Sequence, residues 1–169
     1  MKTKHLLILG IWISLMFPFI SRAQSINSST YNTAIGLRAG GTSGLTIKHF
    51  TSSGAALEGI IGLWSNAFSI TGLYEKHANS GAIGLNWYYG GGGHVAASDR
   101  YHGPSRYYYR DYYSDGGVGI GIDGIVGLEY KITPIPFAIS FDLKPFLEIN
   151  TNGGAFFALD PGLGLKFAF

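Results

Sequence analysis

The sequence has no cysteine among its 169 residues, which excludes a disulfide framework, a thiolate nucleophile and a cysteine metal site. Charge is also scarce, because Asp, Glu, Lys and Arg make up only 13% of the chain. Beyond about the first twenty residues, no apolar run approaches the roughly 20 residues that a membrane-spanning helix needs. The chain therefore fits neither an ordinary solvated enzyme nor a bundle of membrane helices.

Glycine and aromatic residues are abundant instead, with 26 glycines and 15% Phe, Trp and Tyr. Hydrophobic residues reach 46%, and over most of the chain they alternate with polar ones. Such a period of two gives a β-strand one apolar and one polar face. Since the length corresponds to one domain, the sequence predicts a single all-β domain.

The amino terminus has the layout of a secretory signal peptide. Lys2 and Lys4 precede an apolar stretch over residues 6–20, and small residues lead up to Ala23. A basic start, an apolar middle and a small-residue cleavage site predict a signal peptide over residues 1–23. The alternative is an uncleaved membrane anchor, which Pro18 and the small residues make the weaker interpretation.

Removal of the signal peptide changes the charge balance. The remaining residues, 24–169, hold nine Lys and Arg against ten Asp and Glu. The basic character of the whole chain thus belongs to the export signal, and the mature domain offers no electrostatic attraction for nucleic acid.

Eight alternating segments with turn residues between them predict an eight-stranded antiparallel transmembrane β-barrel. The predicted strands cover residues 31–39, 44–50, 55–64, 67–77, 82–90, 118–131, 137–149 and 155–169. One connection is long, at about residues 91–117, and the others are short. The barrel prediction therefore includes one large surface loop.

The strand faces that carry charge are predicted to point into the barrel. They collect Arg38, Lys48, Lys131, Lys144, Lys166, Glu58, Glu75, Asp123, Glu129 and Asp142. An eight-stranded barrel has an interior just wide enough for side chains, and buried charges there need partners. Five positive and five negative residues predict a lumen filled by a charge network. The alternative is a soluble barrel, with its apolar face inside.

Aromatic residues are expected near both rims, as in membrane-spanning barrels. The rim that carries both termini is predicted to hold Tyr31, Phe50, Tyr74, Tyr130, Phe137, Phe167 and Phe169. The opposite rim is predicted to hold Trp64, Phe68, Trp87, Tyr89 and Phe156. Two such girdles indicate contact with lipid at two levels.

The carboxy terminus resembles the insertion signal of bacterial outer-membrane β-barrels. Gly164, Phe167 and the terminal Phe169 match its glycine, its apolar residue and its final aromatic residue. With the signal peptide and the eight segments, the chain resembles small barrels of the OmpA transmembrane and OmpX kind. The resemblance implies a location in the outer membrane of a Gram-negative bacterium, contact with lipid and lipopolysaccharide, and assembly by the barrel insertion machinery. It implies no catalytic residue and no cofactor.

The long connection is rich in tyrosine. Its candidate ligand-binding residues are Tyr101, Tyr107, Tyr108, Tyr109, Tyr112 and Tyr113. Tyrosine offers a large contact area with few rotors to restrict, which suits a binding loop. The other interpretation is that these rings only pack on one another or on lipopolysaccharide.

Two further functions stay open at this point. His94 and His102, with nearby Ser98, Asp99 and Ser105, suggest a lipid A deacylase or acyltransferase, but nothing in the sequence fixes a nucleophile against a base. A spacing of eight between the histidines matches no metal-ligand pattern. The barrel wall could also dock on a larger outer-membrane complex as an accessory subunit. We predict a monomeric, non-enzymatic barrel without metal or cofactor.

Overall fold

A computed structural model describes residues 31–51, 54–64, 67–98, 116–151 and 154–169. The predicted signal peptide over residues 1–23 lies outside the described residues. Within the described part of the chain, no helix is long and apolar enough to cross a membrane.

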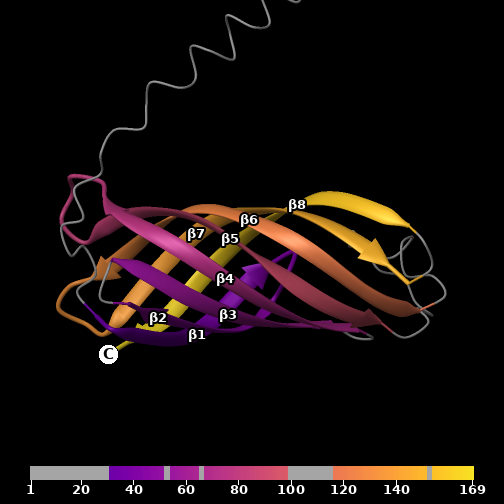
Figure 1. The fold of residues 1–169 in the computed structure, drawn as a ribbon. Helices are drawn as coiled ribbons and strands as arrows, with labels where there is room; N and C mark the ends of the chain where they lie inside the picture. The colour runs from indigo at the N-terminus through magenta and orange to yellow at the C-terminus, as the bar shows by residue number, and fades with distance from the viewer. Residues whose placement is uncertain (1–30, 52–53, 65–66, 99–115, 152–153) are drawn as a thin grey trace, which may run out of the picture.

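The described residues form eight β-strands. They are β1 (Thr33–Gly40), β2 (Gly44–Phe50), β3 (Ala55–Trp64), β4 (Ala67–Asn79), β5 (Leu85–Ser98), β6 (Gly117–Ile132), β7 (Phe137–Asn150) and β8 (Ala155–Ala168). Each strand pairs antiparallel with its neighbours in chain order, and the sheet closes into a barrel with strands tilted to its long axis (Figure 1). The predicted all-β, eight-stranded antiparallel barrel is confirmed.

The barrel closes where the first strand meets the last. β1 and β8 pair from Ala34 opposite Ala168 to Gly40 opposite Gly162. Beyond this ladder, the Phe169 N–H donates to the Thr33 carbonyl at 2.8 Å, and the Thr33 N–H donates to the Phe169 carbonyl at 2.9 Å. Among the eight described strands, none is left with an unpaired edge, which removes the usual site of edge-to-edge aggregation.

Side chains alternate between the two faces of the wall. On β8, Leu163, Leu165 and Phe167 are exposed by 58%, 51% and 47%, whereas Lys166 between them is buried. The same pattern recurs on the other strands, because successive residues of a strand point to opposite faces. The outer wall is thus largely apolar, and nearly all the ionised side chains of the described strands point to the axis.

β5 is longer than the sequence predicts. The prediction ends this strand at residue 90 and places 91–117 in the loop, whereas β5 continues through Gly90–Gly93 to Ser98. Four consecutive glycines are typical of a turn, but none of these has a positive φ. The ladder to β4 therefore continues through the glycines, and His94 lies in a strand rather than in a loop.

Because β5 starts later than predicted, two aromatic residues lie at a different end of the barrel from the one predicted. β5 begins at Leu85, which lies at the same end of the barrel as Phe169, because Asn86 pairs with Asn79 at the end of β4. Trp87 and Tyr89 therefore lie near the terminus end and not near the opposite rim as predicted. The prediction was wrong because it set the strand at residues 82–90, which put Trp87 and Tyr89 at its distal end. In β5, which covers Leu85–Ser98, the same residues lie near the start of the strand.

The connections differ between the two ends. At the terminus end the turns cover residues 51–54, 80–84 and 133–136. At the opposite end, which we call the distal end, the connections cover residues 41–43, 65–66, 99–116 and 151–154. The one long connection therefore leaves the barrel at the distal end.

Candidate functional site

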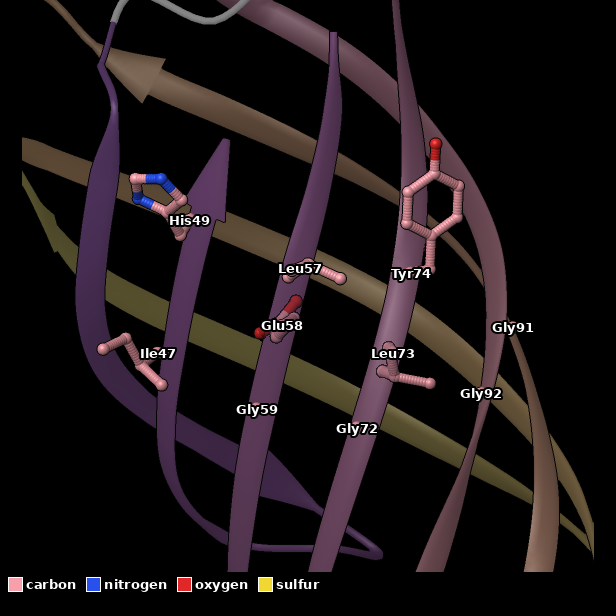
Figure 2. A pocket seen from close by; sticks show the side chains of 10 residues that line it. All are labelled: Ile47, His49, Leu57, Glu58, Gly59, Gly72, Leu73, Tyr74, Gly91 and Gly92. Carbon is pink, nitrogen blue, oxygen red and sulfur yellow. The ribbon is translucent and has the colours of Figure 1, made fainter. Parts of the chain in front are cut away.

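A hollow of about 500 Å³ lies on the barrel wall over β2, β3, β4 and β5 (Figure 2). Gly59, Gly72 and Gly91 form its floor, since their lack of side chains leaves the backbone uncovered. Its sides include the exposed apolar bodies of Leu57 and Tyr74. Ile47 and His49 of β2 complete the side nearest β1. We call this feature the glycine groove.

The interior carries most of the charged residues of the described chain. Four Lys and Arg side chains and seven carboxylates are buried there: Arg38, Lys48, Lys144, Lys166, Glu58, Glu75, Asp123, Glu129, Asp142, Glu148 and Asp160. His77 and His94 are buried among them. Carboxylates thus outnumber the Lys and Arg side chains inside. The two histidines lie beside carboxylates, His77 beside Glu75 and His94 beside Asp123 and Glu148.

One cluster of these charges lies toward the terminus end and centres on Lys48. Its ammonium is fully buried and lies 2.7 Å from Glu75, 3.0 Å from Glu58 and 3.3 Å from Glu129. Lys166 adds a second cation 2.9 Å from Glu58. Buried ions are costly to desolvate, so the ion pairs that these groups share stabilise the cluster in the barrel interior.

Tyr31 covers this cluster at the terminus end of the barrel. Its hydroxyl donates to Glu129 at 2.5 Å, and its ring packs edge-on against Phe50 with 5.0 Å between centroids. Burial, helped by the Glu129 carboxylate, raises the pKa of the Tyr31 hydroxyl far above its usual range. The phenol therefore stays neutral and keeps donating. Tyr31 and Phe50 belong to an apolar cluster with Ala34, Ala56, Ala138 and Ala168.

Tyr88 connects the two halves of the interior. Its ring lies 4.2 Å from the Lys48 ammonium and stacks on His77 at 5.0 Å, while its hydroxyl donates to Asp142 at 3.2 Å. It also belongs to a second apolar cluster with Ile60, Leu73 and Ile125. A neutral ring thus separates the cations of one cluster from the carboxylates of the next.

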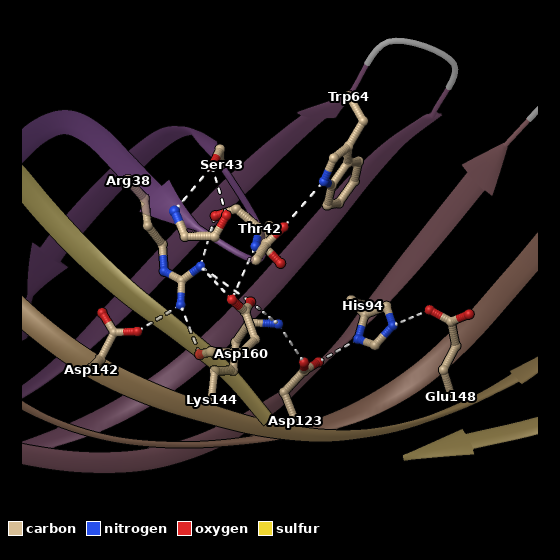
Figure 3. Close-up of polar contacts among 12 residues, drawn as sticks. Arg38, Thr42, Ser43, Trp64, His94, Asp123, Asp142, Lys144, Glu148 and Asp160 are labelled. Atoms are coloured by element: carbon tan, nitrogen blue, oxygen red, sulfur yellow. Dashed lines mark hydrogen bonds and ion pairs between the residues drawn. The ribbon is translucent and has the colours of Figure 1, made fainter. Parts of the chain in front are cut away.

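The second cluster lies toward the distal end and is organised by Arg38 (Figure 3). Its guanidinium contacts Asp142 at 2.7 Å and Asp160 at 3.1 Å, and it donates to the Thr42 carbonyl at 2.7 Å. Asp160 in turn accepts from the Thr42 backbone N–H at 3.0 Å. The network therefore ties the interior of β8 to the turn between β1 and β2.

His94 extends this cluster between two carboxylates (Figure 3). Its Nδ1 lies 2.8 Å from Asp123, and its Nε2 lies 2.8 Å from Glu148. Asp123 also contacts the Lys144 ammonium at 3.0 Å, which links back to Asp160 at 3.4 Å. Both ring nitrogens of His94 are therefore engaged by acids.

Inward-facing glycines make room for these large side chains. A Cβ added at Gly121 would lie 2.3 Å from His94, one at Gly162 would lie 2.3 Å from Arg38, and one at Gly127 would lie 2.6 Å from Tyr88. Large inward side chains therefore occupy the space beside these glycines, where the wall has no side chain of its own.

The ten residues predicted for the lumen network are placed as follows. Nine of them are buried inside the barrel: Arg38, Lys48, Glu58, Glu75, Asp123, Glu129, Asp142, Lys144 and Lys166. Lys131 is only half-buried at the terminus end, where it donates to the Ile132 and Ile135 carbonyls. The prediction omitted Glu148 and Asp160, although both continue the alternation that Asp142 and Lys166 begin.

The other predicted residues lie elsewhere. Gly164 points inward on β8, and Phe167 and Phe169 point outward. The candidate loop residues Tyr101, Tyr107, Tyr108, Tyr109, Tyr112 and Tyr113 lie outside the described residues, as does His102.

His94 is not set up as a base for a neighbouring nucleophile. Its two ring nitrogens bond to Asp123 and Glu148, neither of which is a hydroxyl donor such as a catalytic serine. Among the described residues, no group of three or more His, Cys, Asp or Glu is arranged to bind a metal ion. That the chain is not an enzyme stays a prediction.

Comparison with known proteins adds no relative. No protein-family model, no curated protein and no solved structure matches the chain.

Proposed function

We propose that the chain is an integral outer-membrane β-barrel with a closed lumen, which displays its long distal connection at the cell surface. The observation that carries this proposal is the orientation of the wall. Outward side chains such as Leu57, Phe141 and Leu165 are more than half exposed, while the ionised interior is buried. A soluble barrel has the reverse arrangement, so this wall suits lipid.

The interior supports a structural or binding role rather than transport. The two charge clusters and the Tyr88 layer occupy the space that an eight-stranded barrel encloses. Function then belongs to the surface that the rigid barrel presents. In this proposal the tyrosine-rich connection contacts a surface ligand or lipopolysaccharide.

Insertion is proposed to depend on the carboxy-terminal signal. Deletion of Phe169 should abolish outer-membrane fractionation and the gel shift between unboiled and boiled samples. Because the Phe169 backbone also closes the barrel, Phe169→Leu is the matched control, since it keeps the backbone bonds and an apolar side chain. Equal fractionation and an equal gel shift in the deletion variant and the parent chain would contradict the role of Phe169 in an insertion signal.

Topology can be tested by cysteine labelling, since the chain has no native cysteine. Ser105→Cys in the long connection should react with a membrane-impermeant maleimide on intact cells. Ala82→Cys, in an exposed turn at the terminus end, should react only after the outer membrane is opened. Labelling of Ala82→Cys on intact cells, with Ser105→Cys protected, would overturn the proposed orientation.

A further inference from the structure

Outward-facing glycines gather on one side of the barrel. Among the described strand residues they lie on β3, β4, β5 and β6, and none lies on β7, β8, β1 or β2. They are Gly59, Gly72, Gly91, Gly93 and Gly124. The ladder sets Gly59 opposite Gly72, Gly72 opposite Gly93, and Gly91 opposite Gly124, so the five form one continuous patch.

The fold does not require glycine at two of these positions. Gly59 and Gly72 both lack a positive φ. A Cβ added at Gly72 would meet no atom within 4 Å, and one at Gly59 would meet only the Ile47 methyl at 3.5 Å, an ordinary contact. Glycine weakens a strand, and within strands it often marks a place where another molecule approaches the backbone closely. The presence of glycine at positions 59 and 72 therefore indicates a contact with another molecule on the outside of the barrel.

The same region carries the outer wall's charge. Lys76 is the one Lys or Arg of the described strands that points outward, whereas all seven Asp and Glu side chains of the described residues are buried inside. It lies one outward position beyond Tyr74, toward the terminus end of the groove. His49, the one outward histidine of the described residues, lines the groove and bonds to the Thr33 hydroxyl at 2.9 Å. A cation and an imidazole thus lie at the headgroup end of an apolar hollow.

We propose that the glycine groove binds one acyl chain of an anionic phospholipid, whose phosphate is held by Lys76 and His49. This inference rests on the proposed membrane location. A methylene chain lying on the glycine floor would contact the backbone beneath it and the sides formed by Leu57 and Tyr74, which adds many small dispersion contacts. The phosphate would pair with the ammonium at the interface, where the aromatic ring of Tyr74 also favours the headgroup level.

A lipid fits the groove better than a second copy of the chain. A two-fold contact places the same surface of both subunits face to face, so hollow would meet hollow and Lys76 would approach its own copy. That arrangement leaves a void and brings like charges together. A flexible chain with an anionic head fills the hollow and neutralises the charge.

The test uses the purified full-length protein in mild detergent, with native mass spectrometry as the readout. The probes are phosphatidylglycerol and phosphatidylcholine with identical acyl chains, and glycerol phosphate without a chain. The parent protein should retain one phosphatidylglycerol in preference to phosphatidylcholine. Glycerol phosphate alone should not compete, because it lacks the chain that fills the groove.

Three variants separate the parts of the site. Gly72→Leu places a side chain in the groove at a position where its Cβ meets no atom within 4 Å. It should weaken retention of both lipids by about tenfold or more, a factor that corresponds to about 1.4 kcal/mol. Lys76→Gln should remove the preference for phosphatidylglycerol and leave phosphatidylcholine binding unchanged. Ala39→Leu also places a leucine on the outer face of the barrel, on β1 and away from the groove, and should bind as the parent does.

Defined results would overturn the inference. Retention of lipid by Gly72→Leu at the parent level would do so, as would an equal loss in Ala39→Leu. A dimer of the parent that Gly72→Leu dissociates would assign the groove to a second copy. Outer-membrane fractionation and the gel shift are measured on the same variants. A parent chain absent from the outer membrane would contradict the proposed function. A barrel that is correctly located but retains lipid equally with and without the groove substitutions would contradict this inference alone.

Discussion

Gly92 and Gly72 lie on opposite faces of the barrel wall, and their lack of a side chain has different physical causes. Inside, a Cβ at Gly92 would lie 1.8 Å from the Gly72 carbonyl oxygen, so the barrel cannot close with a larger residue there. Outside, on the adjacent strand, a Cβ at Gly72 would touch nothing. The comparison teaches that an inward glycine serves the packing of the barrel itself, whereas this outward one serves a contact beyond it.

The largest effect is expected from Gly92→Ala. The added Cβ would collide with the backbone of β4, which cannot move away without breaking the ladder. We expect a loss of more than about 4 kcal/mol in the free energy of unfolding, enough to abolish the gel shift of the folded barrel. A folded Gly92→Ala barrel with parent stability in urea would remove the distinction between the two faces.

Lys48→Met should be the next most damaging change. It leaves Glu58, Glu75 and Glu129 without their shared cation, and breaking a buried ion pair costs about 3–5 kcal/mol. Lys76→Met is the matched control, because the same substitution on the outer face breaks no described ion pair and should alter stability by less than about 0.5 kcal/mol. Urea unfolding in detergent measures both, and equal losses would contradict the account of the interior.

Tyr88→Phe should give an intermediate effect. It removes the hydroxyl that donates to the Asp142 carboxylate at 3.2 Å but keeps the ring over Lys48. Hydrogen bonds to charged groups contribute about 1.5–3 kcal/mol, so the unfolding free energy should fall by that amount. Tyr89→Phe, at the next position and on the outer face, should leave the unfolding midpoint in place. A shift in Tyr89→Phe as large as in Tyr88→Phe would argue against the assigned faces.

The smallest effect has the opposite sign. Gly72→Ala should raise the free energy of unfolding by about 0.5–1 kcal/mol, because alanine restricts the unfolded chain and meets no obstacle in the folded barrel. The same urea series detects it. A clear loss of stability would show that the wall itself needs glycine at this position.

The strands could be predicted because alternation with a period of two is a local property of the sequence. Leu163, Leu165 and Phe167 follow it without interruption, and their outward orientation came directly from it. The antiparallel order followed from the short turns, since neighbouring strands joined by such turns must pair.

The errors arose where a residue type has two uses. Residues 91–93 were placed in the long loop because glycine favours loops, yet they continue β5, and glycine there allows close approach between β4 and β5. Asp160 was omitted from the predicted charge network, although the ladder between β7 and β8 runs through it and its neighbour Pro161 to Ala155. The glycine groove could not be predicted, because it depends on the register between neighbouring strands, which the alternation within a single strand does not fix.

The most direct test of the central claim, that the apolar face of the wall meets lipid, is a spin label at Leu165→Cys in lipid vesicles. Ala82→Cys, at an exposed turn, gives the reference for contact with water. The account predicts that molecular oxygen reaches the label at position 165 readily while a water-soluble nickel complex does not. Nickel accessibility at position 165 equal to that at position 82 would contradict it.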